Sequence, residues 1–158
     1  MTGDQIARHL RRANAVAVRA MQMGRHPFGA LLVAPDGETV LAEQGNIDTV
    51  HHAEATLART ASLNYPADHL WGCTLVTTFE PCAMCTGTIY WANMGRIVYG
   101  AREEALLALT GNHAENPTLS LPCREVIAHG QKAIVVIGPV PALEAEMVVP
   151  HRDFWSRR

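Results

Sequence analysis

Apolar residues recur every three to four positions at the start of the chain, which is the spacing of one face of an α-helix. Thr2 can cap this helix, and Gly24 followed by Pro27 is typical of a helix end. The pattern therefore predicts a helix over about residues 2–23, with one apolar stripe against a core. The stripe consists of Ile6, Leu10, Ala13, Ala17 and Met21.

Short apolar runs bounded by turn residues follow this helix, as expected of buried strands. Runs at 28–34 and 39–44 flank Pro35-Asp36-Gly37, where proline presets one dihedral angle and glycine allows a positive φ, so they predict a hairpin. Strands and helices then alternate. The other predicted strands are 73–78, 96–99 and 133–137, and the predicted helices are 52–62, 81–93, 103–109 and 122–129, with helical character at 144–147 and in the tail to Trp155.

This alternation favours an α/β fold, in which a sheet lies between helices on both faces. No internal repeat, low-complexity stretch or linker interrupts the pattern, so we predict that residues 1–158 form a single domain. A chain that is 48% hydrophobic is too apolar to be disordered. No apolar run is long enough to cross a bilayer, and Asp4 and Arg8 interrupt any apolar core of a signal peptide. These features predict a cytoplasmic protein.

Charge bears on the class of partner. The formal net charge of -2 disfavours a nucleic-acid partner, because such proteins usually carry a basic face that neutralises phosphates. Basic residues do cluster in the first helix and at the end of the chain. We favour a solvated helix face with a frayed tail over a track for phosphates. The residues concerned are Arg8, Arg11, Arg12, Arg19, Arg25, Arg157 and Arg158.

Two short motifs carry the candidate chemistry, His52-Ala53-Glu54 and Pro81-Cys82-Ala83-Met84-Cys85. Cys82 and Cys85 are three positions apart, so they share one face of a helix, and we expect both in its first turn. Free N–H groups and the helix dipole stabilise anions there and lower the pKa of a thiol. With His52 the two cysteines give three ligands for Zn²⁺. The open fourth position is typical of catalytic zinc sites.

Glu54 follows His52 by two residues, so its carboxylate could reach a water activated by the metal without being a ligand. It would take a proton from that water, whose oxygen attacks a ring carbon bearing an amino group, and pass the proton to the departing ammonia. An H-x-E followed by P-C-x-x-C is the signature of zinc nucleobase deaminases. Cys73 or Cys123 could complete a structural zinc site instead, but we expect both to be small buried residues.

The two motifs belong to a longer set of residues over about 27–99. The set comprises Pro27-Phe28-Gly29-Ala30, Asn46, His52-Ala53-Glu54, Phe79-Glu80-Pro81-Cys82-Ala83-Met84-Cys85, Gly87, Ile89 and Arg96-Ile97-Val98-Tyr99-Gly100-Ala101. On these residues the chain resembles the cytidine deaminase-like superfamily, in particular its guanine deaminases, tRNA adenosine deaminases and small nucleoside deaminases. The resemblance implies a three-layer α/β/α sandwich with a five-stranded mixed sheet, and usually a homodimer.

The resemblance also implies roles for residues that are not metal ligands. Asn46 would hydrogen-bond the base, Phe28 would line the pocket, and the backbone N–H of Ala53 would contact the base carbonyl or its equivalent. From the residues alone, Asn46 could instead be a turn residue after Gly45, and Phe28 could instead be a core residue.

The substrate is suggested by Ile89-Tyr90-Trp91-Ala92, which is similar to the same helix of guanine deaminases. Trp91 is therefore a candidate for substrate binding, and a purine such as guanine is favoured. The Phe-Asp-Asp-like segment of guanine deaminases has no counterpart here. By analogy the tail could form a lid through Asp153, Phe154 and Trp155, or it could be an apolar end docked on the core. Deamination of tRNA adenosine, deamination of cytosine or another amino-heterocycle, and a non-catalytic zinc scaffold are the alternatives.

Overall fold

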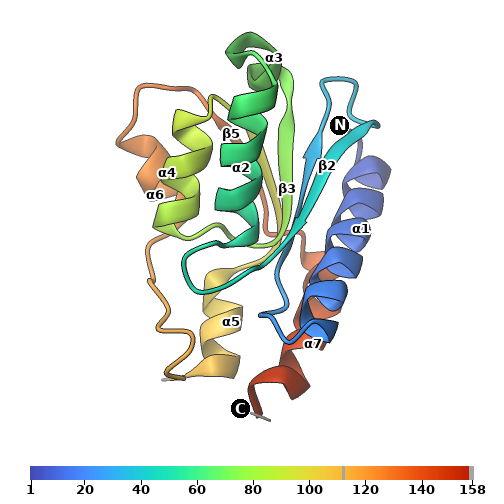
Figure 1. Cartoon of the computed structure of the whole chain (residues 1–158), viewed down its shortest axis with the longest axis vertical. Coiled ribbons are helices and arrows are strands. Elements are labelled where there is room, and N and C mark those ends of the chain that lie inside the picture. Colours follow the sequence, from blue (N-terminus) through green and yellow to red (C-terminus); the bar gives the residue numbers. More distant parts are fainter. Residues whose placement is uncertain (112, 157–158) are drawn as a thin grey trace.

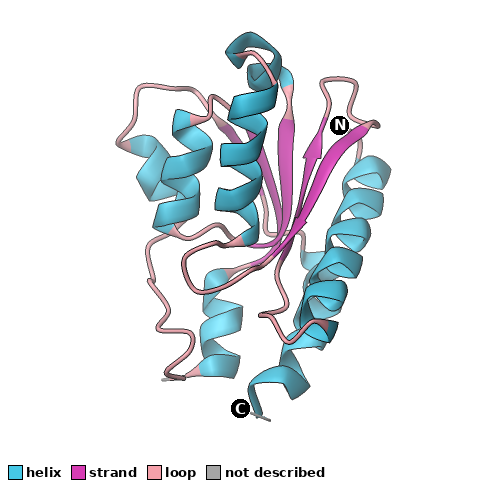
Figure 2. Ribbon diagram, in the orientation of Figure 1, coloured by secondary structure: helices cyan, strands magenta, loops and turns pink. Residues whose placement is uncertain are grey.

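The structure is a computed structural model that describes residues 1–111 and 113–156, the side chains of Asp153 and Ser156 excepted. Five strands form one mixed sheet, and helices cover both of its faces, as the sequence predicts (Figure 1, Figure 2). The strand order is β2-β1-β3-β4-β5. The strands are β1 (Gly29–Val33), β2 (Val40–Gly45), β3 (Thr74–Phe79), β4 (Arg96–Ala101) and β5 (Val135–Ile137).

The predicted hairpin is present, because β1 pairs with β2 in antiparallel fashion. Strand β1 also pairs antiparallel with β3, whereas β3, β4 and β5 run parallel to one another. The carboxyl ends of β3 and β4 therefore lie side by side, where Phe79 is paired with Ala101. Ligands of α/β sheets commonly bind at the carboxyl ends of parallel strands.

The helices divide into two layers around the sheet. Helices α2, α4 and α6 cover one face and α1 and α7 the other, while α5 follows the carboxyl end of β4 and packs on α7 (Figure 1). None of the described helices is long and apolar enough to cross a membrane. The helices are α1 (Gly3–Gln22), α2 (Ala53–Asn64), α3 (Ala67–Gly72), α4 (Ala83–Trp91), α5 (Glu103–Thr110), α6 (Cys123–Ala128) and α7 (Pro141–Ser156).

Alternate residues of β3 pack into different halves of the core. Leu75 belongs to the apolar cluster under α2 and α4, and Val76 belongs to the cluster under α1 and α7. Because successive side chains of a strand point to opposite faces, Thr77 shares the face of Leu75 and points toward α2. The buried hydroxyl of Thr77 therefore lies beside the start of α2, where His52 and Glu54 are located.

Gly29 allows α1 to lie close to the sheet. A Cβ atom at this position would lie 2.3 Å from the carbonyl oxygen of Ala13 and 2.7 Å from the backbone nitrogen of Ala17. Both are backbone atoms of a packed helix, so neither can move away as a flexible side chain could. The adjacent Phe28 is thereby fixed at the start of β1.

Two elements differ from the sequence prediction. Helix α3 was not predicted, because its six residues are too few to show a helical period. The helical pieces predicted at 144–147 and in the tail are one helix, α7, with Pro150 inside it. Proline leaves the carbonyl four residues earlier without its helical partner. Here that carbonyl, of Glu146, accepts a hydrogen bond of 3.1 Å from Nδ2 of Asn14, so α1 compensates for the proline.

Candidate active site

The start of α2 carries two of the predicted site residues. His52 is the N-cap residue, and Glu54 lies in the first helical turn. His52 is partly buried, whereas the Glu54 side chain is inside the protein. The start of α2 thus brings the imidazole and the carboxylate to the same site.

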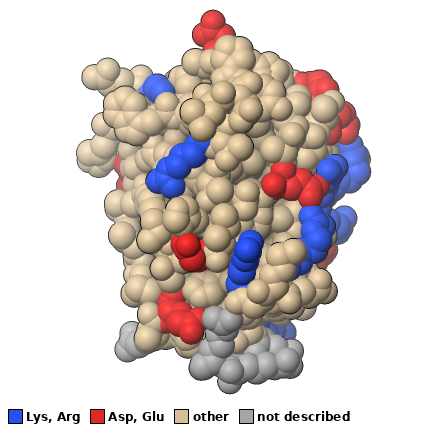
Figure 3. Space-filling model, in the orientation of Figure 1, with Lys and Arg blue, Asp and Glu red and all other residues tan. Residues whose placement is uncertain are grey.

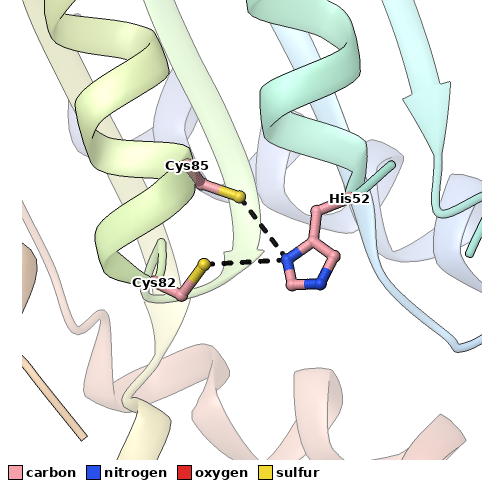
Figure 4. A group of neighbouring side chains, drawn as sticks. All are labelled: His52, Cys82 and Cys85. Carbon is pink, nitrogen blue, oxygen red and sulfur yellow. Dashed lines mark hydrogen bonds between the residues drawn. The ribbon is translucent and has the colours of Figure 1, made fainter. Parts of the chain in front are cut away.

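The start of α4 carries the two cysteines. Cys82 is the N-cap residue, one position earlier than the predicted place in the first turn, and Cys85 lies within that turn. Their sulfur atoms both face Nδ1 of His52, at 3.7 Å from Cys82 and 3.6 Å from Cys85 (Figure 4). The ligand atoms of the three residues all lie within 4.8 Å of one another.

These distances fit a zinc ion. Zinc bonds of about 2.3 Å to sulfur and about 2.1 Å to nitrogen, at tetrahedral angles, hold the two donor atoms about 3.6 Å apart. Both N···S separations agree with that value. Among the described residues this is the one group of histidine, cysteine and carboxylate donors that could hold a metal ion. Cys73 and Cys123 are buried free cysteines outside it, as predicted.

The three donors are linked electrostatically. The hydrogen bond from the Cys85 thiol lowers the pKa of Cys82 to about 4, and the same bond raises the pKa of Cys85. The hydrogen bond to Cys82 raises the pKa of His52. When a metal binds, His52, Cys82 and Cys85 must release the protons that they share in this way, because the metal requires thiolates and a neutral imidazole nitrogen.

Glu54 is held by a threonine hydroxyl. The Thr77 hydroxyl donates a hydrogen bond of 2.7 Å to Oε1 of Glu54, and the other oxygen, Oε2, lies 3.6 Å from Sγ of Cys85. Burial raises the pKa of Glu54, and the hydrogen bond from Thr77 opposes that rise. A buried carboxylate with a raised pKa beside a metal group is suited to taking up and releasing a proton near neutral pH.

A small cavity opens beside the metal group. Two phenylalanine rings form its apolar wall, with their centroids 5.9 Å apart and an interplanar angle of 83°. The remaining lining is polar or belongs to the metal group, which is the composition expected of a site for a small polar ring. The lining residues are Phe28, His52, Glu54, Phe79, Glu80, Cys82, Glu103 and Asn116.

The predicted substrate-binding residues near this cavity differ in their surroundings. Phe28 lines it, and Ala53 is buried between His52 and Glu54 at the helix start. Asn46 is buried outside the lining. Its Nδ2 donates to the backbone oxygen of Asp48 at 3.0 Å, as expected of a turn residue, while its Oδ1 has no partner among the described residues.

The other predicted substrate-binding residues are not in the lining. The Trp91 side chain is 81% exposed and borders a separate groove with Met84 and Arg59, because six residues along α4 carry it to a different side of the helix from Cys85. Trp155 is buried, and its Nε1 donates to Nδ1 of His151 at 3.1 Å. The side chain of Asp153 lies outside the described residues.

The tail is packed behind the cavity wall. The His151 ring lies 4.9 Å from the ring of Phe28 and 4.6 Å from that of Phe79, measured between centroids. Phe154 and Trp155 belong to the same apolar cluster as Phe79. This arrangement corresponds to an end docked on the core, which supports the two phenylalanines from behind.

Five cavity or site residues were missed at the level of sequence, namely Thr77, Phe79, Glu80, Glu103 and Asn116. Phe79 stands next to the cysteine motif and could have been found from that position. A threonine in a strand, a glutamate in a first helical turn and an asparagine in a loop are each common without any function. Their shared position follows only from the sheet register and from the segment after β4.

The chain matches the cytidine and deoxycytidylate deaminase zinc-binding region over residues 4–101. It is 33% identical over 151 residues to the probable cytosine deaminase of Schizosaccharomyces pombe, which covers 94% of this chain and 91% of that protein. It is 39% identical over 97 residues to the guanine deaminase of Bacillus subtilis, with coverage of 58% and 62%. It is 34% identical over 99 residues to the tRNA-specific adenosine deaminase of Haemophilus influenzae, with coverage of 60% and 57%.

The fold also matches solved structures. The guanine deaminase of Nitrosomonas europaea superposes with a TM-score of 0.70 at 20% identity, over 94% of this chain and 83% of that chain. The match over residues 4–101 includes the motifs of all three metal donors and Glu54. The chain therefore belongs to the cytidine and deoxycytidylate deaminase family and is a zinc-dependent deaminase, a hydrolase that acts on C–N bonds.

Proposed function

We propose that this protein hydrolytically deaminates a free amino-substituted nucleobase or its nucleoside, with a guanine-type purine as the favoured substrate. The observation that carries the proposal is the placement of the buried Glu54 beside the His52, Cys82 and Cys85 donors, at one end of a cavity walled by aromatic rings. An aromatic wall suits contact with a planar ring, and the acid–base group lies next to the metal group.

In this proposal His52, Cys82 and Cys85 hold the zinc ion, which supplies the acidity that makes water a nucleophile at neutral pH. Glu54 accepts the proton of the attacking water while the new C–O bond forms at the ring carbon bearing the amino group. Glu54 then donates this proton to the amino nitrogen, the C–N bond breaks, and ammonia leaves. Thr77 orients the Glu54 carboxylate for both transfers. Phe28 and Phe79 form the apolar wall beside the ring and exclude water.

The choice of base rests on the cavity and the relatives together. The guanine deaminase of Bacillus subtilis and the fold match to that of Nitrosomonas europaea support a guanine-type purine. A cytosine-type base is the second candidate, because the Schizosaccharomyces pombe relative is similar over almost the whole of both chains. The motif that contains Trp91 favours guanine, but the Trp91 side chain is too exposed to contact either base within one chain.

Deamination of a tRNA is the less favoured alternative, since the arginines of α1 are already paired. Arg12 and Arg19 both bind Glu43, at 2.5 and 2.6 Å, and Arg11 binds Glu146 at 2.9 Å. Acidic and basic side chains lie beside one another along the edge of the molecule formed by α1 (Figure 3). A phosphate track needs cations that are not neutralised by neighbouring carboxylates.

The test is ammonia release by the zinc-loaded protein from guanine, adenine, cytosine and their nucleosides, with Glu54→Ala as the matched control. We expect turnover of guanine above that of the others, and a loss of about 100-fold or more in Glu54→Ala at unchanged zinc content. No turnover of any of these compounds would refute the proposal. Preferential turnover of a tRNA anticodon stem-loop, with binding that weakens steeply with salt, would favour the tRNA alternative.

The expected homodimer and the single domain over residues 1–158 are part of the same proposal. Trp91 and Leu63 are 81% and 88% exposed, on the helix layer formed by α2 and α4. Trp91 shares a groove with Ala83, Met84 and Ala92, and a contiguous exposed apolar surface of this kind is typical of association with another protein. A second copy bound there would cover Trp91 and would be the route by which this side chain reaches a substrate.

A further inference from the structure

The carboxyl group of Glu103 has no role in the chemistry described so far, yet it lines the metal cavity together with Glu54 and Cys82. Glu103 is the first residue of α5, directly after β4, so the carboxyl end of a central strand delivers it to the cavity. Its carboxyl group makes no hydrogen bond and no ion pair with any other described residue. A carboxylate that is partly removed from water without a partner is costly, so its retention in a cavity needs a cause.

Stabilisation of the helix start is not a sufficient cause. Acidic residues in a first turn interact favourably with the helix dipole, but Glu104 occupies the same turn of α5 and is exposed. Glu104 can supply that interaction without any loss of solvation. Burial, with the nearby negative charges of Cys82 and Glu54, raises the pKa of Glu103 to about 8. The position of this side chain does not favour the stability of the fold. It lies close to the end of the cavity where Glu54 and the metal group are located.

We propose that Glu103 is a substrate-binding residue that accepts a hydrogen bond from a ring N–H adjacent to the amino-bearing carbon of the heterocycle. This inference rests on the proposed function and narrows its substrate class. Guanine has such an N–H at N1, next to the carbon that bears its amino group. Adenine and cytosine have an unprotonated nitrogen at the equivalent position, which a carboxylate repels. Above the pKa of Glu103, where its carboxyl group is ionised, Glu103 thus selects guanine-type rings against the other two.

The other polar groups of the cavity leave this task to Glu103. Glu54 is engaged by the Thr77 hydroxyl and by its position at the metal group. Glu80 accepts a hydrogen bond of 3.0 Å from the backbone nitrogen of Cys123. The Asn116 side chain donates to the hydroxyl of Thr118 at 3.1 Å. Of the carboxyl groups in the lining, Glu103 is the one that lacks a partner among the described residues.

The experiment compares Glu103→Gln with Glu104→Gln, an identical change at the neighbouring exposed position. Binding of guanine is measured by tryptophan fluorescence at a pH above the pKa of Glu103, in zinc-loaded protein that carries Glu54→Ala, so that no turnover occurs. We expect Glu103→Gln to weaken binding about tenfold to a hundredfold, the usual effect of losing a charged hydrogen-bond partner. Glu104→Gln should bind as the parent protein does. Because the partly buried charge is lost, the melting temperature of Glu103→Gln should be equal to or above that of the parent.

A methylated substrate tests the atom that is recognised. With Glu54 intact, 1-methylguanine should be turned over less efficiently than guanine by the parent protein, through an increase in KM. The penalty for the methyl group should be smaller in Glu103→Gln and in Glu103→Ala, because the contact is already lost. If either variant misfolds by circular dichroism, the other carries the comparison, and the methylated substrate still tests the parent.

Two results would overturn this inference alone. One is guanine turnover by the parent protein together with unchanged guanine binding in Glu103→Gln. The other is an equal fall in kcat for every base without a change in KM, which would indicate a proton-transfer role. Absence of binding and turnover for all bases in the parent protein would overturn the proposed function and this inference with it.

Discussion

Replacing Thr77 by valine removes the hydroxyl that holds Glu54 and changes little else in shape. The Thr77 side chain is fully buried, and its hydroxyl donates to the Glu54 carboxylate at 2.7 Å. A hydrogen bond to a charged group contributes about 1.5–3 kcal/mol. Because this bond stabilises the ionised form, its loss raises the pKa of Glu54 by about one to two units, at about 1.4 kcal/mol per unit.

The assay is the pH profile of kcat/KM, since Glu54 must be ionised to accept the proton of water. The acid limb of the profile should move to higher pH in Thr77→Val by about one to two units, whereas the alkaline limb should stay in place. Thr78→Val is the matched control, because Thr78 is equally buried but points to the opposite face of the sheet, where its hydroxyl accepts from the Gly29 nitrogen at 3.4 Å. An acid limb that coincides in Thr77→Val and the parent protein would refute the reasoning.

The remaining predictions concern the metal, the core and association. Cys82→Ala should lose zinc and much stability together, whereas Cys123→Ala should keep its zinc, and atomic absorption with thermal unfolding distinguishes the two; full zinc content in Cys82→Ala would contradict the ligand assignment. Gly29→Ala should destabilise the fold by about 3 kcal/mol, because the new methyl group meets the backbone of α1, and an unchanged midpoint in urea would count against that contact. Trp91→Lys should convert a dimer into monomers, and light scattering that finds a monomeric parent protein would remove the basis of this prediction.

The metal group was predictable from sequence because each pair of residues is local. His52 and Glu54 lie within one helix start, and Cys82 and Cys85 lie within another, so their relative positions follow from helix geometry. The sequence alone does not show how the start of α2 is positioned relative to the start of α4. That depends on β3, whose carboxyl end leads into Cys82 and whose middle residues face α2.

Thr77 and Glu103 were not predictable, for different reasons. A threonine in a strand is ordinary, and whether Thr77 faces Glu54 or α1 depends on a one-residue choice of register. Glu103 has the spacing of a helix-start carboxylate, and only the packing of α5 distinguishes it from the exposed Glu104. Trp91 shows the converse case. Its motif suggested a role in the pocket, but its angular position on α4 places it outside the pocket of its own chain.

Glu103 and Asn116 lie in a later part of the chain than the metal group, and this separation in sequence has an evolutionary consequence. The donors and Glu54 are built on α2 and α4, whereas these two cavity residues belong to the chain that follows β4. Under the proposed role of Glu103, mutations in that later stretch would alter which base fits while the hydrolytic apparatus stays intact. A gene for one deaminase could thus give rise to an enzyme with a new preference through single substitutions, without an inactive intermediate.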